Sequence, residues 1–397
     1  MNTLFNKLRL KWFIARRTLG YTEDYVEHLY RIYLNHTKII HFRDGYPVYS
    51  LSTPALFSKP AANFLARSLY RSIQNKNFPN LMSFAVNDIC DAACEHCSFF
   101  TGVDDSTRAV MSVDQCRRVI RQGLDLGVSI INFVGGEPLL RKDLPDIINS
   151  VDKSQASTVL FTNGSQLAER AAELRRAGLD SVYVSIDAAS AEQHDQFRGK
   201  PGLFNKAMEG IAKAKATGMT IGLSCSISPE SFEAGALDRI IELGKQIGIH
   251  EVLIFDTMPT GRYQHRTDLI DNTDWVETMI DSLRPYNEDP SYPGVISFAY
   301  MTSHRSVGCS CGTSYLYVSP YGDIMSCDFN HAKFGNALET PLYKIWDDLS
   351  SRPEFQQAKW GGCKIKDSEF RQLESVSPVA SNTSESCNQT PRTFNIT

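Results

Sequence analysis

The chain has 397 residues, of which 42% are hydrophobic, and its formal net charge is −4. This length allows one large domain or two to three ordinary ones, with enough apolar residues to form a core. A slightly acidic chain is atypical of proteins that bind nucleic acid, so we expect no nucleic-acid partner. The sequence shows no apolar run of about 18 residues or more and no secretory signal, which predicts a cytoplasmic protein without a membrane-spanning helix.

Residues 1–80 form a leader whose fold the sequence does not define. Within it, residues 4–17 are basic and amphipathic, with Leu4, Leu8 and Trp12 recurring at helical spacing among lysines and arginines. This pattern fits peripheral contact of residues 1–17 with a membrane. It is more often found in a helix that docks on its own domain.

Residues 81–260 alternate between apolar, strand-like runs and amphipathic helical patterns. Strands are expected at residues 82–86, 129–134, 158–161, 181–186, 220–226 and 251–255, and helices at 113–126, 144–152, 166–177, 203–217 and 236–247. The helices should end at Gly127, Gly178, Gly218 and Gly248. This alternation predicts an α/β fold, either a partial (βα)6 barrel or an open doubly wound sheet. In barrel enzymes, the active site lies at the carboxyl ends of the strands.

The C-terminal part is less regular. Residues 261–308 are interpreted as a connecting helical region, residues 309–373 as a smaller β-hairpin and helix module, and residues 374–397 as a disordered tail. The chain has ten cysteines and no secretory signal, which favours metal binding or catalysis over disulfides. Cys116 and Cys225 lie in a predicted helix and a predicted strand, and both are expected to be buried packing residues.

Three cysteines, Cys90, Cys94 and Cys97, follow the first predicted strand with the spacing C-x3-C-x2-C. Three thiolates on one loop can hold a metal centre and leave one position unfilled, because four-iron clusters normally take four cysteines. From these residues alone, a Cys3His zinc site with His96 as the fourth ligand stays open.

A second motif, Gly135-Gly136-Glu137-Pro138, ends the second predicted strand. Paired glycines let the backbone approach a ligand closely, and the Glu137 carboxylate can accept hydrogen bonds from an ammonium group. Taken alone, the motif is also typical of a turn between a strand and a helix.

Together the two motifs resemble the radical S-adenosylmethionine (SAM) superfamily. The resemblance implies that Cys90, Cys94 and Cys97 hold a [4Fe–4S] cluster whose remaining iron binds SAM, and that Gly135–Pro138 bind the SAM amino group. It also implies reductive cleavage of SAM to a 5′-deoxyadenosyl radical, which abstracts hydrogen from an unactivated C–H bond. A reductant such as flavodoxin or ferredoxin would supply the electron. His96 departs from the family, which usually has an aromatic residue before the last cysteine.

Asn163, Ser185 and Asp187 at later strand ends, and Arg198 in the segment after them, fit the same picture. The resemblance places Ser185 and Asp187 near the SAM ribose and Arg198 near the SAM carboxylate, which suits the planar donors of arginine. The residues alone leave open that Asp187 caps a helix and that Arg198 forms a surface ion pair.

The C-terminal module contains Cys309, Cys311 and Cys327, and the spacing from Cys311 is C-x10-G-x4-C. This resembles the SPASM and Twitch extensions, in which a hairpin and later cysteines hold an auxiliary Fe–S cluster. Gly322 fits the hairpin turn. Only Cys363 and Cys387 follow, too few for two auxiliary clusters, so one cluster on Cys309, Cys311, Cys327 and Cys363 is expected. A hairpin without a cluster is the alternative.

The predicted function is the net oxidation of a small-molecule cofactor, a tetrapyrrole-type pigment or a lipid precursor. An auxiliary cluster favours oxidation because it can remove a second electron from the substrate. Two alternatives stay open, a maturase that crosslinks or epimerises a ribosomally made peptide, and a non-catalytic Fe–S or zinc scaffold.

Overall fold

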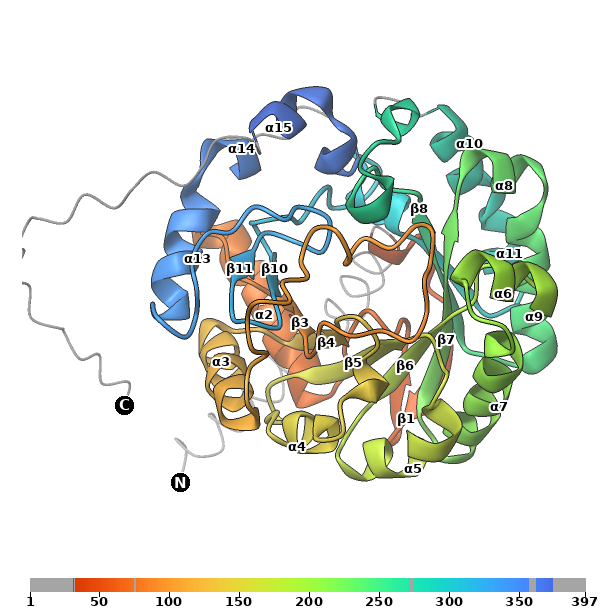
Figure 1. Cartoon of the computed structure of the whole chain (residues 1–397), viewed down its shortest axis with the longest axis horizontal. Coiled ribbons are helices and arrows are strands. Elements are labelled where there is room, and N and C mark those ends of the chain that lie inside the picture. The colour runs from red at the N-terminus through yellow and green to blue at the C-terminus, as the bar shows by residue number, and fades with distance from the viewer. Residues whose placement is uncertain (1–30, 32, 75, 271–273, 357–361, 374–397) are drawn as a thin grey trace, which may run out of the picture.

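A nine-stranded, curved sheet forms the centre of the molecule, as the computed structural model shows for residues 31, 33–74, 76–270, 274–356 and 362–373 (Figure 1). All six predicted strands are present and mutually parallel. They are β3 (Leu81–Ala85), β4 (Ile130–Val134), β5 (Ser157–Thr162), β6 (Ser181–Ser185), β7 (Thr220–Ile227) and β8 (Glu251–Asp256). The sheet order is β11-β10-β3-β4-β5-β6-β7-β8-β9, which confirms the α/β fold of a partial barrel.

The five predicted helices lie on the outer face of this sheet (Figure 1). They are α3 (Val113–Leu126), α4 (Leu144–Asn149), α5 (Leu167–Arg176), α7 (Leu203–Ala216) and α9 (Ala236–Ile247). A capping box of Ser112 and Gln115 starts α3, and Gly127 ends it in the left-handed conformation at φ 102°. Successive side chains along each strand point to opposite faces of the sheet. Those on the outer face form a core with the helices, and those on the inner face form a second core inside the barrel.

The sheet extends beyond the six predicted strands at both edges. Strand β9 (Gly294–Ser297) adds a parallel neighbour to β8, within a region expected to be a helical connection. Helices α10 (Asp274–Ser282), α11 (Arg284–Glu288) and α12 (Phe298–Thr302) surround it. At the other edge β10 (Tyr315–Val318) pairs in parallel with β3, and β11 (Ile324–Met325) returns antiparallel. The hairpin of the C-terminal module is therefore continuous with the barrel sheet.

Short helices complete the C-terminal part: α13 (Leu342–Ser351), α14 (Pro353–Gln356), η4 (Lys364–Lys366) and α15 (Ser368–Leu373). A buried ion pair attaches this region to the barrel, because the ammonium of Lys366 donates to Asp256 at the end of β8. The two side chains are only 2% and 3% exposed. Breaking such a pair leaves an uncompensated buried charge, so it holds the module firmly in place.

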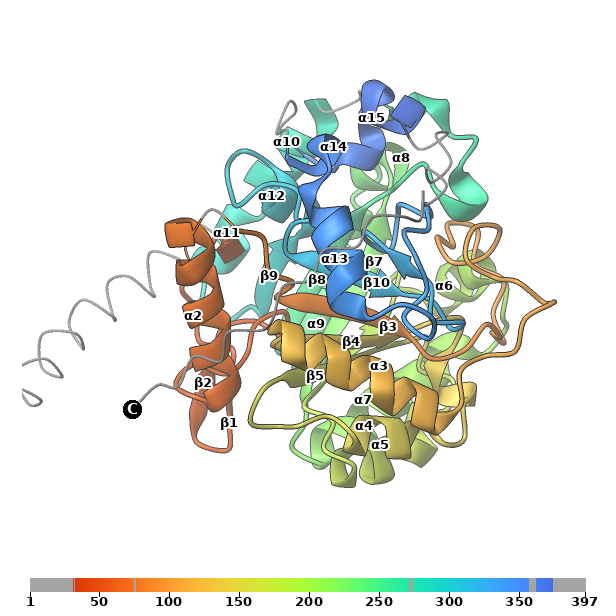
Figure 2. The ribbon, with the colours of Figure 1, turned by 90° about the vertical axis from the view of Figure 1, so that its left-hand side faces the viewer.

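The described part of the leader closes the barrel at the end opposite the loop that follows β3 (Figure 2). It contains β1 (His41–Arg43), β2 (Tyr46–Val48) and α2 (Lys59–Gln74). Leu34, Leu51 and Leu56 pack against inward-facing strand residues such as Ile130 and Leu253. Residues 1–17, the predicted membrane contact, and the predicted tail 374–397 lie outside the described residues. Within the described ranges, no helix has the length and apolar character needed to cross a membrane.

Glu251 gives the stability of this closure a defined pH dependence. Burial raises the pKa of Glu251 from 4.5 to about 7, despite hydrogen bonds from Tyr183, Leu51 and Ser50. When an acid has a higher pKa in the folded state than in the unfolded state, it does not destabilise the protein at pH values below the unfolded-state pKa. As the pH rises toward the folded-state pKa of about 7, the free energy of unfolding falls. The full shift corresponds to a loss of about 3 kcal/mol. Glu251→Gln should therefore gain stability relative to wild type between pH 5 and pH 8, as measured by urea unfolding.

The matched control is Glu209→Gln, the same substitution on the exposed face of α7. If the stability difference between Glu251→Gln and wild type is the same at pH 5 and pH 8, the buried ionisation of Glu251 is refuted.

Candidate active site

The three-cysteine loop follows β3 and crosses the mouth of the barrel (Figure 1). Neighbouring loops hold its backbone, since Ala93 N donates to Arg198 O at 2.9 Å and Arg262 N donates to Cys97 O at 3.0 Å. The Arg262 guanidinium also donates to Cys94 O at 2.8 Å. Gly261 permits this contact, because a Cβ there would lie 2.2 Å from the Cys97 carbonyl oxygen.

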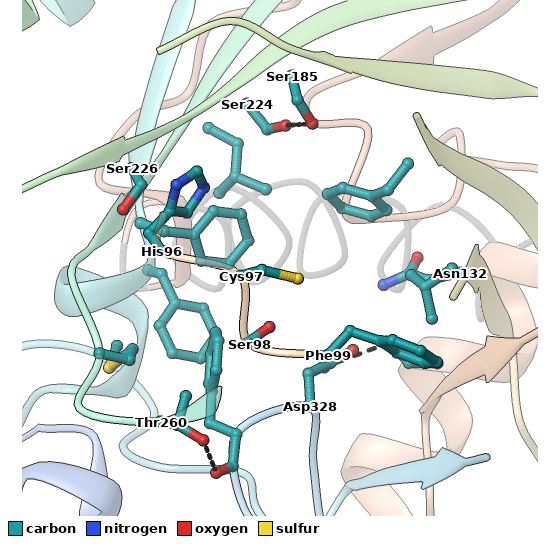
Figure 3. A pocket seen from close by; sticks show the side chains of 18 of the residues that line it. His96, Cys97, Ser98, Phe99, Asn132, Ser185, Ser224, Ser226, Thr260 and Asp328 are labelled. Atoms are coloured by element: carbon teal, nitrogen blue, oxygen red, sulfur yellow. Dashed lines mark hydrogen bonds between the residues drawn. The ribbon is translucent and has the colours of Figure 1, made fainter. Parts of the chain in front are cut away.

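Cys90, Cys94 and Cys97 all border one cavity, and all three are free thiols. Figure 3 shows Cys97 with its sulfur directed into that cavity. Burial raises the pKa of Cys90 to about 12, so a metal centre must displace a proton when it binds there. The donor set fits a cluster held by three thiolates.

The Gly135–Pro138 segment faces the cysteine loop directly. Gly136 N donates to Asn87 O at 3.2 Å and Glu137 N donates to Ile89 O at 2.7 Å. A Cβ on Gly136 would lie 2.1 Å from the Ile89 carbonyl oxygen, so only glycine permits this approach. The two motifs therefore form one unit, as the resemblance implies.

Glu137 is only 1% exposed and makes three hydrogen bonds. Its Oε1 accepts from Leu139 N at 3.0 Å and from the Thr162 hydroxyl at 2.6 Å, and its Oε2 accepts from Asn163 N at 2.7 Å. Burial raises the pKa of Glu137 to about 7, although these hydrogen bonds lower it. A carboxylate has about four acceptor positions, so one on Oε2 stays available for an ammonium group.

Replacing Gly136 with alanine should separate the two loops, because the new Cβ cannot share space with the Ile89 carbonyl. A displacement of about 1 Å in a site of this kind lowers rates by about 100-fold. We expect that loss in SAM cleavage, measured as 5′-deoxyadenosine formed under anaerobic reduction. Gly218→Ala is the control, since its Cβ meets nothing within 4 Å and only backbone strain at φ 79° is added. Equal activity of the two variants would contradict this geometry.

Asp187 and Arg198 form a buried ion pair beside Cys94. Arg198 Nε donates to Asp187 Oδ2 at 2.6 Å, and Arg198 Nη1 lies 3.6 Å from Cys94 Sγ. Burial raises the pKa of Asp187, but the charge of Arg198, the nearby His96 and His194 and a hydrogen bond from Ser226 N together outweigh this, and the net shift is downward. The helix-cap interpretation of Asp187 is wrong, because Ser190 caps α6 (Ala191–Arg198). The ion pair of Arg198 exists, but it is not on the surface.

The remaining predicted residues border the same cavity. Ser185 and Ser224 share a hydrogen bond of 3.3 Å across neighbouring strands (Figure 3). Asn163 donates to Asp91 Oδ1 at 2.8 Å and so connects β5 to the cysteine loop. His96 stacks on Phe197 with ring centroids 4.8 Å apart, and its Nδ1 has no partner among the described residues. Cys116 is buried as expected, whereas Cys225 is buried and also borders the cavity.

The cavity has a volume of about 320 Å³ and extends from the cysteine loop into the barrel. Its apolar wall includes Phe161, Phe255, Phe298 and Phe329. Polar residues that the sequence did not single out also line it: Tyr33, Ser52, Ser83, Asn132, Asp256 and Asp328. Among the described residues of the wall there is one arginine, Arg198, and no lysine.

The four cysteines of the C-terminal module lie together. The Cys311 thiol donates to Ser326 Oγ at 2.9 Å, and Cys311 and Cys363 each lie close enough to Cys309 and Cys327 to interact with them. Interaction with Cys311 lowers the pKa of Cys309, which favours its thiolate. Within the described chain, no three His, Cys, Asp or Glu side chains meet at the spacing of a single metal ion. A four-iron cluster binds one sulfur at each corner and requires a wider arrangement.

Comparison with family models decides the assignment. Residues 85–233 match the model of the radical SAM superfamily, and residues 309–375 match SPASM, described as an iron–sulfur cluster-binding domain. The chain contains a radical SAM domain followed by a SPASM domain. The residues around Cys90 fit a [4Fe–4S] cluster and SAM, as a radical SAM domain requires, and the zinc interpretation with His96 is set aside.

Curated relatives of this radical SAM enzyme include the AdoMet-dependent heme synthase of Methanosarcina barkeri, where AdoMet is SAM. It is 27% identical over 319 residues, covering 73% of this chain and 90% of the relative. The Fe-coproporphyrin III synthase of the same organism is 26% identical over 290 residues, covering 66% of this chain and 72% of the relative.

Solved structures show the same fold. Streptococcus suis SuiB bound to S-adenosylmethionine superposes with a TM-score of 0.59 at 16% identity, covering 83% of each chain. The enzyme anSMEcpe with bound AdoMet gives a TM-score of 0.55 at 15% identity, covering 75% of this chain and 91% of the other. At this level of identity the likeness concerns the fold alone.

Proposed function

We propose that this radical SAM enzyme carries out the net oxidation of a tetrapyrrole-type small molecule. The observation that supports this proposal most is that one cavity reaches from the three-cysteine loop to residues beside the cysteines of the C-terminal module. Cys90, Cys94 and Cys97 line one side, and Ser310 and Asp328, each next to a cysteine of the C-terminal module, line the other. A substrate in this cavity lies between a site that generates a radical and a site that can take up an electron.

The cavity wall suits a flat, aromatic substrate. Phe255, Phe298 and Phe329 form a cluster with ring centroids 5.3, 5.4 and 6.2 Å apart. Aromatic faces bind planar ring systems through offset and edge contacts. The relatives named for heme and Fe-coproporphyrin III synthesis match most of their own length here, which supports the same substrate class for this chain.

Each group of residues in the site has a separate proposed role. When bound, the cluster and SAM supply a 5′-deoxyadenosyl radical that abstracts hydrogen from an unactivated C–H bond. Cys90, Cys94 and Cys97 would hold the cluster, Glu137 would accept a hydrogen bond from the SAM ammonium, and the pair of Asp187 and Arg198 would orient SAM near Cys94. The apolar wall excludes water, which protects a reactive intermediate.

An auxiliary Fe–S cluster on Cys309, Cys311, Cys327 and Cys363 would accept the second electron of the oxidation. Their mutual contacts and burial support this role, since the cavity residues Phe298 and Phe329 pack against Cys363. A small protein reductant such as flavodoxin or ferredoxin would supply the first electron, and the reaction would take place in the cytoplasm. Peripheral membrane contact through residues 1–17 remains a hypothesis that rests on the sequence pattern alone.

The test is an anaerobic incubation of the reconstituted enzyme with SAM, dithionite and Fe-coproporphyrin III, followed by mass spectrometry. We expect 5′-deoxyadenosine to form faster with the tetrapyrrole than without it, together with an oxidised tetrapyrrole of changed mass. If the tetrapyrrole is recovered unchanged and does not affect SAM cleavage, the proposed substrate class is wrong.

A further inference from the structure

A buried carboxyl below the cavity is not used by the chemistry described above. Glu251 opens β8, is fully buried and accepts three hydrogen bonds on its Oε2 atom. The donors are the Ser50 hydroxyl at 3.1 Å, Leu51 N at 2.9 Å and the Tyr183 hydroxyl. Two of these three donors belong to the leader, so Glu251 fixes the leader inside the barrel.

This fixed segment reaches the cavity itself. Tyr33 and Ser52 border it from the side opposite the cysteine loop, and no other residue of the described leader does so. Tyr183 lies two residues before Ser185 on β6, which places it roughly 7 Å deeper in the barrel. The leader therefore forms the floor of the cavity and determines its depth.

The hydrogen-bond chain at this floor has a defined direction. When Glu251 is ionised, Tyr183 donates its one hydroxyl proton to that carboxylate. Ser52 Oγ lies 3.1 Å from the Tyr183 oxygen, so in this state Ser52 is the donor in that contact. The Ser52 proton is thereby engaged, and toward the cavity Ser52 can only accept a hydrogen bond.

We propose that residues 33–56 are a specificity-determining floor, on which Ser52 accepts a hydrogen bond from an N–H or O–H group at the far end of the substrate. Tyr183 and Glu251 are positioning residues that orient Ser52. The surrounding charges favour the same ligand, because the wall contains the carboxyl groups of Glu137 and Asp328, while its one arginine is paired with Asp187 and Lys366 is paired with Asp256. A carboxylate at this end would meet an acceptor and no free cation. For its choice of ligand, the inference rests on the proposed tetrapyrrole substrate.

The test compares two tetrapyrroles that differ in this property, Fe-coproporphyrin III and its amide, in which N–H donors replace the peripheral carboxylates. Binding to the reconstituted enzyme is followed by visible absorption. We expect the amide to bind at least about 5-fold more tightly, the value of one hydrogen bond, and Ser52→Ala to abolish this preference. Thr53→Val is the matched control, since Thr53 lies on the same loop, is buried and does not border the cavity.

Tyr183→Phe retains the ring that stacks on Phe161 at 4.9 Å but loses the hydroxyl that orients Ser52. It should reduce the preference as Ser52→Ala does, and the double variant should show no further reduction. Additive effects would show that Tyr183 acts only through packing. A preference for the amide that persists in Ser52→Ala would overturn the inference.

A second probe separates this inference from the proposed function. Nile red, a neutral planar dye, needs only an apolar cavity and reports binding by fluorescence. Ser52→Phe fills the floor and should weaken Nile red binding at least about 10-fold, whereas Thr53→Val should not. If wild type binds neither tetrapyrrole, the proposed function is wrong, but Nile red binding still tests whether residues 33–56 form the floor of the cavity. Unchanged Nile red binding by Ser52→Phe would refute the claim that Ser52 lies on the floor of the cavity.

Discussion

Replacing Cys94 with alanine should abolish reductive cleavage of SAM. Cys94 is 8% exposed, borders the cavity and lies 3.6 Å from the Arg198 guanidinium, so its loss removes the most buried of the three proposed cluster ligands. Two remaining thiolates cannot hold a four-iron cluster stably. We expect 5′-deoxyadenosine below the detection limit and about four fewer irons per chain.

Cys116→Ala is the control for this experiment. Cys116 is equally a buried free thiol, but it packs inside α3 and its Sγ faces Met111 O at 3.8 Å, away from the cavity. Its loss should lower the free energy of unfolding by about 1 kcal/mol and leave iron content and SAM cleavage intact. Full SAM cleavage by Cys94→Ala would mean that the cluster is held by other residues.

Replacing Cys311 with alanine should separate SAM cleavage from substrate oxidation. Cys311 lies close to both Cys309 and Cys327, so its removal should disrupt the whole group. Iron content should fall from about eight to about four per chain. SAM cleavage without substrate should continue within about 2-fold of wild type, while formation of the oxidised product should fall at least about 100-fold. Iron counting and product analysis check both parts.

An unchanged iron content in Cys311→Ala would support the hairpin without a cluster, which the sequence left open. The small number of later cysteines made that alternative reasonable. Cys363 lies beside the other three cysteines, and the buried ion pair of Lys366 and Asp256 attaches the segment after it to the barrel. A contact between residues 110 positions apart is not encoded in local spacing.

The parallel core was predictable because its signals are local. Strands β3 to β8 are apolar runs of five to eight residues, and Gly127 and Gly248 end helices where the pattern stops. The cysteine and glycine motifs were found for the same reason, since each lies in a short continuous stretch. Strand β9 was missed because four residues of Gly-Val-Ile-Ser carry too little pattern to define a strand.

Residues brought together by long-range packing were also missed. Ser52 and Tyr33 belong to the site only because Glu251 binds the leader 200 positions away in sequence. Gly261 and Arg262 support the cysteine loop from the end of β8, and nothing in their neighbourhood marks them. The one available signal was the buried polar residue at a strand start, Glu251, which needs partners from outside its own strand.

The most direct test of the central claim is isotope transfer from the substrate. Fe-coproporphyrin III deuterated on its side chains is incubated anaerobically with the reconstituted enzyme, SAM and dithionite, and 5′-deoxyadenosine is analysed by mass spectrometry. We predict that one deuterium from the tetrapyrrole appears in 5′-deoxyadenosine. Unlabelled 5′-deoxyadenosine, formed at the same rate with and without the tetrapyrrole, would contradict hydrogen abstraction from this substrate.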